Sequence, residues 1–116
     1  FVGVQTDARP YYAAADALVH PALYEPFGNV NLEAMACGLP IAVSTSCGAS
    51  DVVREGVNGY VLDAFDAEGF AYAIERLRDP EHAQEMGRKA RETAEGFPIA
   101  AMAEQMTALY RQLLRA

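Results

Sequence analysis

Short apolar runs alternate with segments of helical spacing over the first two thirds of the chain. The apolar runs have the length and composition of buried strands. They span residues 1–4, 17–20, 41–43 and 60–62. The helical segments predicted between them span 11–15, 29–37 and, as a short turn, 50–55. This alternation predicts βαβ units, so we expect a short parallel sheet of about four strands with helices on both faces.

The second predicted helix has the clearest boundaries. Asn29 is a suitable N-cap, and Gly38 follows the last residue of the helical pattern as a C-terminal stop. Val30, Ala34 and Cys37 fall on one face, which we expect to pack on the sheet. Cys37 is therefore predicted to be a small buried residue.

From residue 66 onward the pattern is helical throughout. One helix carries an apolar stripe through Phe70 and Leu77, a second spans 81–95, and a third follows Pro98 to the end of the chain. The last helix has apolar residues at spacings of four, three and four: Met102, Met106, Leu109 and Leu113. Such stripes are core or docking faces and do not indicate a cofactor site.

The order of the elements indicates the tail half of a doubly wound α/β domain. We expect residues 1–97 to form a partial Rossmann-like domain. Residues 98–116 are expected to form a C-terminal helix that packs back on this domain or toward a missing N-terminal domain. Because the chain opens inside an apolar run without an initiator Met, it is interpreted as a fragment whose first strands lie upstream. One edge of the sheet is then unpaired, which predicts marginal stability or self-association of the fragment.

Composition narrows the classes of function. Hydrophobic residues make up 52% and charged residues 22% of the 116 residues, which is typical of one globular domain. The net charge of −7 argues against nucleic acid or an anionic membrane surface as a partner. The basic residues from Arg88 to Arg91 lie among glutamates and are typical of a solvated helix face. Cys37 and Cys47 are too few for a disulfide framework or a zinc site, and they are compatible with a reducing cytoplasm.

Candidate chemistry is concentrated between residues 24 and 40. This stretch has the pattern of a strand end, a loop with Pro26 and Gly28, and a helix start, which is where ligands bind in open α/β sheets. Free amides at Gly28, Asn29 and Val30, together with the helix dipole, predict a site for an anion such as a diphosphate.

Two carboxylates, Glu25 and Glu33, frame this predicted anion site. One of them can accept hydrogen bonds from sugar hydroxyls while the other accepts them from a ribose diol. The alternative is that Glu33 is an ordinary acidic residue near a helix start, where such residues are common. On the residues alone both alternatives stay open.

The frame E-P-F-G-x-x-x-x-E-A-M-A-C-G-x-P, from Glu25 to Pro40, resembles the Glu-x7-Glu signature of glycosyltransferase family 4, whose members have the GT-B fold. The resemblance covers almost the whole chain. Further stretches resemble the family's preceding helix, its glycine-pair turn and its last strand: residues 11–16, 47–53 and 56–61. Two features depart from the family. Cys47 replaces the first glycine of the pair, and the resemblance implies that the family's basic residues, which neutralise the diphosphate, would lie upstream of this chain.

The resemblance implies the donor-binding C-terminal part of a retaining glycosyltransferase. It would transfer a hexosyl-type group from a nucleoside diphosphate sugar to a glycan, lipid or lipopolysaccharide-like acceptor. Glu25 would contact hydroxyls of the donor sugar as a catalytic group, and Glu33 would bind the ribose. The amides that would contact sugar and diphosphate belong to Phe27, Gly28, Asn29 and Val30. The resemblance implies no metal and no cofactor besides the donor substrate.

Partners and location follow from the same resemblance. The acceptor would bind through the missing N-terminal domain, so the fragment alone would be inactive. A cytoplasmic enzyme without nucleic-acid partners is implied, and peripheral membrane association of the full enzyme stays open.

Two other functions and a few further residues stay open. The chain could belong to a GT-B relative such as a nucleotide-sugar epimerase, or to a non-catalytic nucleotide-binding domain. His20 lies at a strand end and could contact ligand, although a structural role is favoured. Ser44, Thr45 and Ser46 could bond a nucleotide or sugar, or could serve as turn and capping groups.

Overall fold

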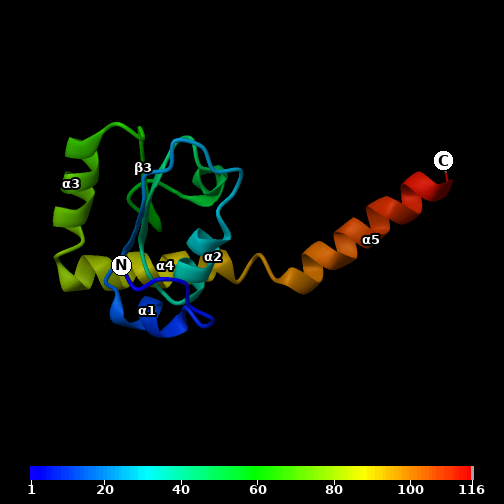
Figure 1. Ribbon diagram of the computed structural model, residues 1–116, viewed down its shortest axis with the longest axis horizontal. Coiled ribbons are helices and arrows are strands. Elements are labelled where there is room, and N and C mark those ends of the chain that lie inside the picture. The colour runs from blue at the N-terminus through cyan, green and yellow to red at the C-terminus, as the bar shows by residue number, and fades with distance from the viewer. Residues whose placement is uncertain (116) are drawn as a thin grey trace.

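The computed structural model describes residues 1–115 and has the expected mixed α/β architecture (Figure 1). Three strands, β1 (Leu18–His20), β2 (Ile41–Ser44) and β3 (Gly59–Leu62), form one parallel sheet in the order β1-β2-β3. The register places Val19 opposite Ala42, and Ala42 opposite Tyr60. The helices are α1 (Arg9–Ala14), α2 (Asn29–Ala36), the 3-10 helix η1 (Gly48–Val52), α3 (Ala67–Arg76), α4 (Pro80–Ala94) and α5 (Ile99–Arg115).

Both faces of the sheet are covered, as the continuous apolar strands predict. Side chains alternate along β2, so Ile41 and Val43 lie in one core with residues of α2, while Ala42 lies in a second core with residues of α3. Helix α4 closes both cores, because its Ala90 belongs to the first and its Met86 to the second. The predicted fold class, a short parallel sheet flanked by helices, is therefore confirmed.

Residues 1–4 do not form the predicted strand. Phe1 and Val4 are fully exposed, and this segment pairs with no strand of the described sheet. Gly3 has a φ of 70°, outside the extended region, so the run is bent rather than straight. An apolar run becomes a strand only where a neighbour accepts and donates its backbone hydrogen bonds. The sheet within residues 1–115 consequently has three strands rather than about four.

The boundaries and the buried face of α2 also differ from those predicted. The helix ends at Ala36, so Cys37 is its C-cap and is exposed rather than buried. Gly28, rather than Asn29, is the N-cap. The buried face comprises Asn31, Ala34 and Met35. A pattern based on apolar residues alone misses a polar core position, which is why it places this face one residue too early, at Val30.

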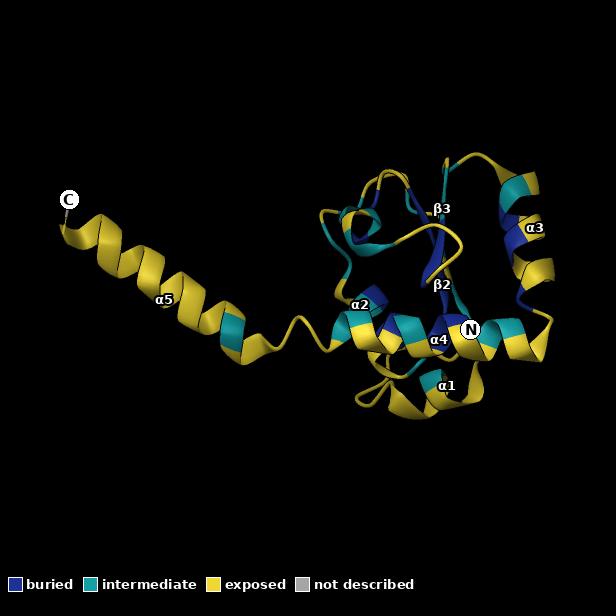
Figure 2. Ribbon diagram, turned by 180° about the vertical axis from the view of Figure 1, so that it is seen from behind, coloured by how far each residue is buried: buried dark blue, intermediate teal, exposed yellow. Residues whose placement is uncertain are grey.

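Helix α5 extends away from the rest of the chain (Figure 1), and almost all of its surface is exposed (Figure 2). None of its described residues is buried. The residues of its apolar stripe are exposed: Met102, Met106, Leu109 and Leu113. The docking of residues 98–116 on this domain or on a missing one stays a prediction. No helix within residues 1–115 is long and apolar enough to cross a membrane.

Candidate functional site

The loop between β1 and α2 is fastened to the turn that follows β2. The Gly48 amide donates to the Glu25 carbonyl at 2.9 Å, and the Ala49 amide donates to the Phe27 carbonyl at 3.1 Å. A Cβ on Gly48 would lie only 2.0 Å from the Pro26 carbonyl oxygen, so this close approach requires glycine. The two loops therefore meet beyond the carboxyl ends of β1 and β2, where open α/β sheets bind ligands.

Helix α2 begins without a side-chain cap. Its N-cap Gly28 has φ 76° and ψ 79°, a left-handed conformation that favours glycine. The Asn31 amide donates to the Gly28 carbonyl at 2.9 Å. Among residues 1–115 the backbone amides of Phe27, Gly28, Asn29 and Val30 have no hydrogen-bond partner. Unpaired N–H groups at the positive end of a helix are hydrogen-bond donors that favour an anion.

The two predicted carboxylates lie on either side of these amides along the chain. Glu25 is half-buried in the loop, and Glu33 is exposed one turn into α2. The Tyr12 hydroxyl of α1 donates to Glu33 Oε2 at 2.8 Å. Burial first, and then this hydrogen bond and the carboxylate charge, raises the pKa of Tyr12 to about 12. Tyr12 therefore keeps its proton at neutral pH and holds one oxygen of Glu33.

A buried amide, that of Asn31, supports the loop from within. Its Nδ2 lies 3.0 Å from the Gly28 carbonyl oxygen, 3.4 Å from Cys47 Sγ and 3.1 Å from His20 Nδ1. Cys47 Sγ in turn donates to the Phe27 carbonyl at 3.3 Å. Cys47 is buried, so the substitution in the glycine-pair turn fills the space under the loop instead of facing a ligand. His20 accordingly has a structural partner, as favoured from the sequence.

Sequence reasoning missed both Asn31 and Tyr12. A signal for Asn31 was present, because it is three and four residues before Ala34 and Met35 and therefore on their helix face. Tyr12 has no comparable local signal, since it lies 21 residues from Glu33.

Other residues singled out in the sequence have local structural roles. The Ser44 hydroxyl is buried and donates to the Ala22 carbonyl at 2.5 Å, while Thr45 and Ser46 are exposed. His82, the other histidine of the chain, is no site candidate, and its ring shares a 2.9 Å hydrogen bond with the Tyr60 hydroxyl. No group of three or more His, Cys, Asp or Glu side chains within the described residues could hold a metal ion.

The basic cluster of α4 is neutralised by its own helix. Arg88 pairs with Glu85 and Glu92, and Lys89 and Arg91 also pair with glutamates. The interpretation as a solvated helix face is therefore confirmed.

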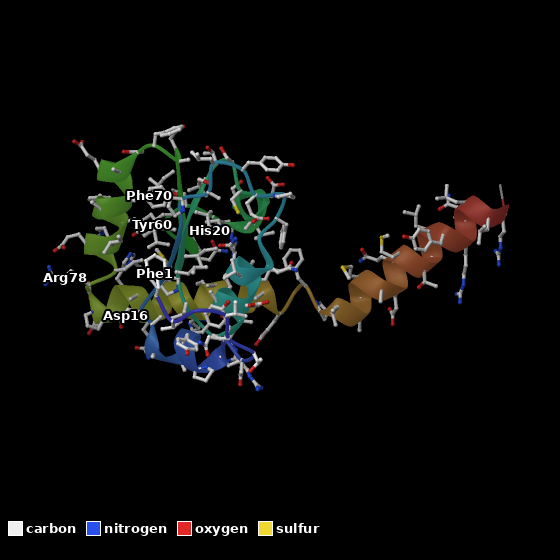
Figure 3. The ribbon with its side chains drawn as sticks, in the orientation of Figure 1. Phe1, Asp16, His20, Tyr60, Phe70 and Arg78 are labelled. Carbon is white, nitrogen blue, oxygen red and sulfur yellow. The ribbon has the colours of Figure 1, made fainter. Side chains whose placement is uncertain are left out.

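A hollow of about 660 Å³ lies away from the start of α2, at the free edge of β1 beside α3 and α4. Asp16 and Arg78, labelled in Figure 3, are among its lining residues. None of the predicted site residues lines this hollow.

The sequence matches a family of transferases. The family described as "Glycosyl transferases group 1" matches residues 1–93. The chain is similar to the lipopolysaccharide core biosynthesis glycosyltransferase LpsE of Rhizobium meliloti, with 47% identity over 77 residues that cover 66% of this chain and 23% of LpsE. Across the curated relatives it matches, the chain spans about a quarter to a third of their length.

Solved structures of the same class share the fold. Sucrose-phosphate synthase from Thermosynechococcus elongatus has a TM-score of 0.84 and 43% identity, over 90% of this chain and 27% of that one. Anabaena Alr3699/HepE, solved in complex with UDP-glucose, has a TM-score of 0.86 and 28% identity, over 97% of this chain and 32% of that one. Because the family match covers most of the chain and the fold agrees with it, this chain belongs to the glycosyl transferases of group 1.

Proposed function

We propose that this chain is the donor-binding part of a longer, retaining GT-B glycosyltransferase of family 4. The observation that carries the proposal is the set of four amides, from Phe27 to Val30, that have no partner among residues 1–115 and lie along the chain between Glu25 and Glu33. The geometry suits a nucleoside diphosphate sugar, which presents a diphosphate between a sugar and a ribose. The complex of Alr3699/HepE with UDP-glucose supports a donor of this class.

Each group has a distinct task in the proposed reaction. Glu25 binds hydroxyls of the donor sugar and holds the glycosyl group, and Glu33 accepts hydrogen bonds from the ribose diol. Oε1 of Glu33 is available to the ribose, because the Tyr12 hydroxyl donates only to Oε2. As the bond from the anomeric carbon to the diphosphate oxygen breaks, the amides stabilise the charge that develops on the leaving diphosphate. The acceptor hydroxyl oxygen forms the new bond to the anomeric carbon on the same face of the sugar, and its proton passes to the departing diphosphate oxygen.

The rest of the enzyme is expected to contribute further groups. The chain is acidic, and the cations of α4 are held in ion pairs, so we place further positive charge for the diphosphate outside α4. We place the acceptor, a glycan, lipid or lipopolysaccharide-like molecule, on the domain that faces this site. The proposed enzyme is cytoplasmic and needs no metal ion.

Donor binding to the complete enzyme tests the proposal. Ligand-observed NMR with uridine, guanosine and adenosine diphosphate sugars would be recorded for the wild type and for Glu33→Ala and Glu25→Ala. Loss of a charge-assisted hydrogen bond predicts that Glu33→Ala weakens one class of donor by roughly 10- to 100-fold. Glu25→Ala should lower transfer of the sugar more than binding of the nucleoside diphosphate. Glu104→Ala, which removes an exposed carboxylate of α5, is the matched control.

The outcomes separate the open alternatives. A wild type that binds no nucleotide-sugar, or Glu33→Ala and Glu25→Ala variants that bind like it, would leave the family fold without donor-site function. Binding without transfer to any acceptor would favour the non-catalytic nucleotide-binding domain. Epimerisation of the donor sugar without transfer would favour the epimerase.

A further inference from the structure

The amide of Asn31 and the ring of His20 form a polar pair under the candidate site. Asn31 is fully buried on α2, and His20 is half-buried at the end of β1. Figure 3 labels His20 beside the start of α2. His20 Nδ1 lies 3.2 Å from Asn31 Oδ1 and 3.1 Å from Asn31 Nδ2, so the amide faces one ring nitrogen with both of its polar atoms.

The hydrogen-bond inventory of Asn31 decides the tautomer of His20. Asn31 Nδ2 has two protons and three acceptors besides the ring: the carbonyls of Gly28 and Phe27 and the sulfur of Cys47. Asn31 Oδ1 has one neighbour that can donate among residues 1–115, which is His20 Nδ1. A buried carbonyl oxygen without a donor is unfavourable. Nδ1 therefore carries the proton, and in the neutral ring Nε2 is left as a hydrogen-bond acceptor.

Nε2 of His20 is available to a ligand. It has no hydrogen-bond partner within the described residues, and it is not among the buried unpartnered atoms, so it reaches the surface. The adjacent ring atom Cε1 lies 3.1 Å from the point where a Cβ on Gly28 would stand, and Cγ of Glu25 lies 3.0 Å from that same point. The imidazole edge and the Glu25 side chain thus converge on the backbone of Gly28.

We infer that His20 is a further donor-binding residue, whose Nε2 accepts a hydrogen bond from a hydroxyl of the donor sugar beside Glu25. Asn31 is the positioning residue that fixes the accepting tautomer. A sugar ring presents several hydroxyl donors, and Glu25 and His20 then supply two acceptors with different directions, which select among sugars by the orientation of their hydroxyls. This inference rests on the proposed function, because it names a contact to the same donor.

Two substitutions of His20 separate its two nitrogens. In His20→Asn the shorter side chain keeps a polar group near the Nδ1 position, within reach of Asn31, and places nothing at the Nε2 position. In His20→Gln the amide reaches the Nε2 position and supplies an acceptor oxygen there. We expect His20→Asn to weaken donor binding by roughly 3- to 10-fold, the size of one neutral hydrogen bond, and His20→Gln to recover most of it.

Deoxy donors identify the hydroxyl. The donor that lacks the contacted hydroxyl should bind equally well to the wild type and to His20→Asn, whereas every other deoxy donor should still distinguish them. Equal donor binding by the wild type and His20→Asn would overturn the inference. The inference would also be overturned if no deoxy donor removed the difference in donor binding between the wild type and His20→Asn.

The tautomer is measured directly by nitrogen-15 NMR of the histidine-labelled complete enzyme at a pH where the ring is neutral, with His20→Asn used for assignment. The expected spectrum shows a protonated Nδ1 and an unprotonated Nε2 for His20, and Asn31→Ala should mix the two tautomers. A proton on Nε2 in the wild type would contradict the inference, even if the substituted proteins folded poorly. Donor binding by the wild type that is weakened by Glu33→Ala but unchanged in His20→Asn would overturn this inference alone and leave the proposed function standing.

Discussion

Two helices of this chain, α2 and α4, begin in opposite ways. Helix α4 starts at Asp79, whose carboxylate accepts the amides of Glu81 at 3.1 Å and His82 at 3.5 Å, and Pro80 at its first position has no N–H to satisfy. Helix α2 starts at Gly28, which has no side chain, and its first amides stay unpaired among residues 1–115. The protein itself supplies a hydrogen-bond acceptor to first-turn amides of α4, whereas the first amides of α2 have no acceptor among residues 1–115.

The difference indicates which helix start can serve a ligand. A side-chain cap is worth about 1 kcal/mol relative to alanine but only a few tenths of a kcal/mol relative to glycine, so α2 forgoes little stability with Gly28 as its N-cap. A carboxylate at position 28 would occupy the amides and repel a diphosphate, whereas glycine leaves them open. The start of α2 is held instead by two other contacts. The Asn31 side chain donates to the Gly28 carbonyl, and the turn at Gly48 donates to the loop before the helix. Stability and ligand access are thus supplied by different residues.

The largest effect is expected from a substitution that disrupts the start of α2. In Gly28→Ala the new Cβ would lie 2.7 Å from Asn31 Nδ2, 3.0 Å from Glu25 Cγ and 3.1 Å from His20 Cε1, at a positive φ that L residues rarely adopt. The loop must shift, and misplacement of the amides should weaken donor binding roughly 100-fold. Titration of the complete enzyme with the donor, followed by NMR, measures the change.

Gly38→Ala is the matched control for that experiment. Gly38 has a φ of 80°, but a Cβ there would meet nothing within 4 Å. It should lose about 1–2 kcal/mol of stability through backbone strain and keep donor affinity. Equal losses of donor affinity in both variants would mean that strain, rather than the site, explains the effect of Gly28→Ala.

A substitution at the start of α4 should lower stability and leave donor affinity unchanged. Asp79→Ala removes a cap and should lower the free energy of unfolding by about 1 kcal/mol without changing donor affinity. Thermal unfolding and donor titration of the same sample measure the two quantities. Asp66→Ala, which removes the carboxylate that accepts the Gly69 amide at 2.8 Å, should behave alike. A donor affinity that falls with either cap would show that the two helix starts are not independent.

A smaller effect is expected at the edge of the site, where Tyr12 donates to Glu33. The pKa of Tyr12 is raised to about 12 in the folded chain, so its contribution to stability is complete below pH 10 and is lost as pH rises from about 10 to 12. Ultraviolet titration should show one late-titrating phenol that is missing in Tyr12→Phe and that titrates earlier in Glu33→Gln. A full set of phenols at ordinary pKa in the wild type would contradict the contact.

Local sequence patterns identified the residues proposed for the site but not the long-range contacts that hold them in place. The apolar run of β2, the glycine at 28 and the carboxylates at 25 and 33 are visible in short windows of sequence. The contacts that hold them are not, because Asn31 meets His20 across 11 residues and Tyr12 meets Glu33 across 21. Residues 1–4 have the composition of a strand, yet only a neighbouring strand could make them one. Periodicity describes a segment, whereas pairing and burial depend on what packs against it.

The smallest effect is expected for the charges of α4, and it tests where the cations of the site come from. Arg88 is exposed and paired with Glu85 and Glu92, and the hydrogen bond that it donates to Glu85 lowers the pKa of that carboxyl. Exposed pairs contribute little and are screened by salt, so Arg88→Ala should melt nearly as the wild type does and should match it in concentrated salt. Donor affinity should also be unchanged, because the guanidinium is bound to its own helix. A clear loss of donor affinity in Arg88→Ala would instead place part of the diphosphate-neutralising charge on α4, and the contrast between an α2 proposed to bind the donor and a purely structural α4 would no longer hold.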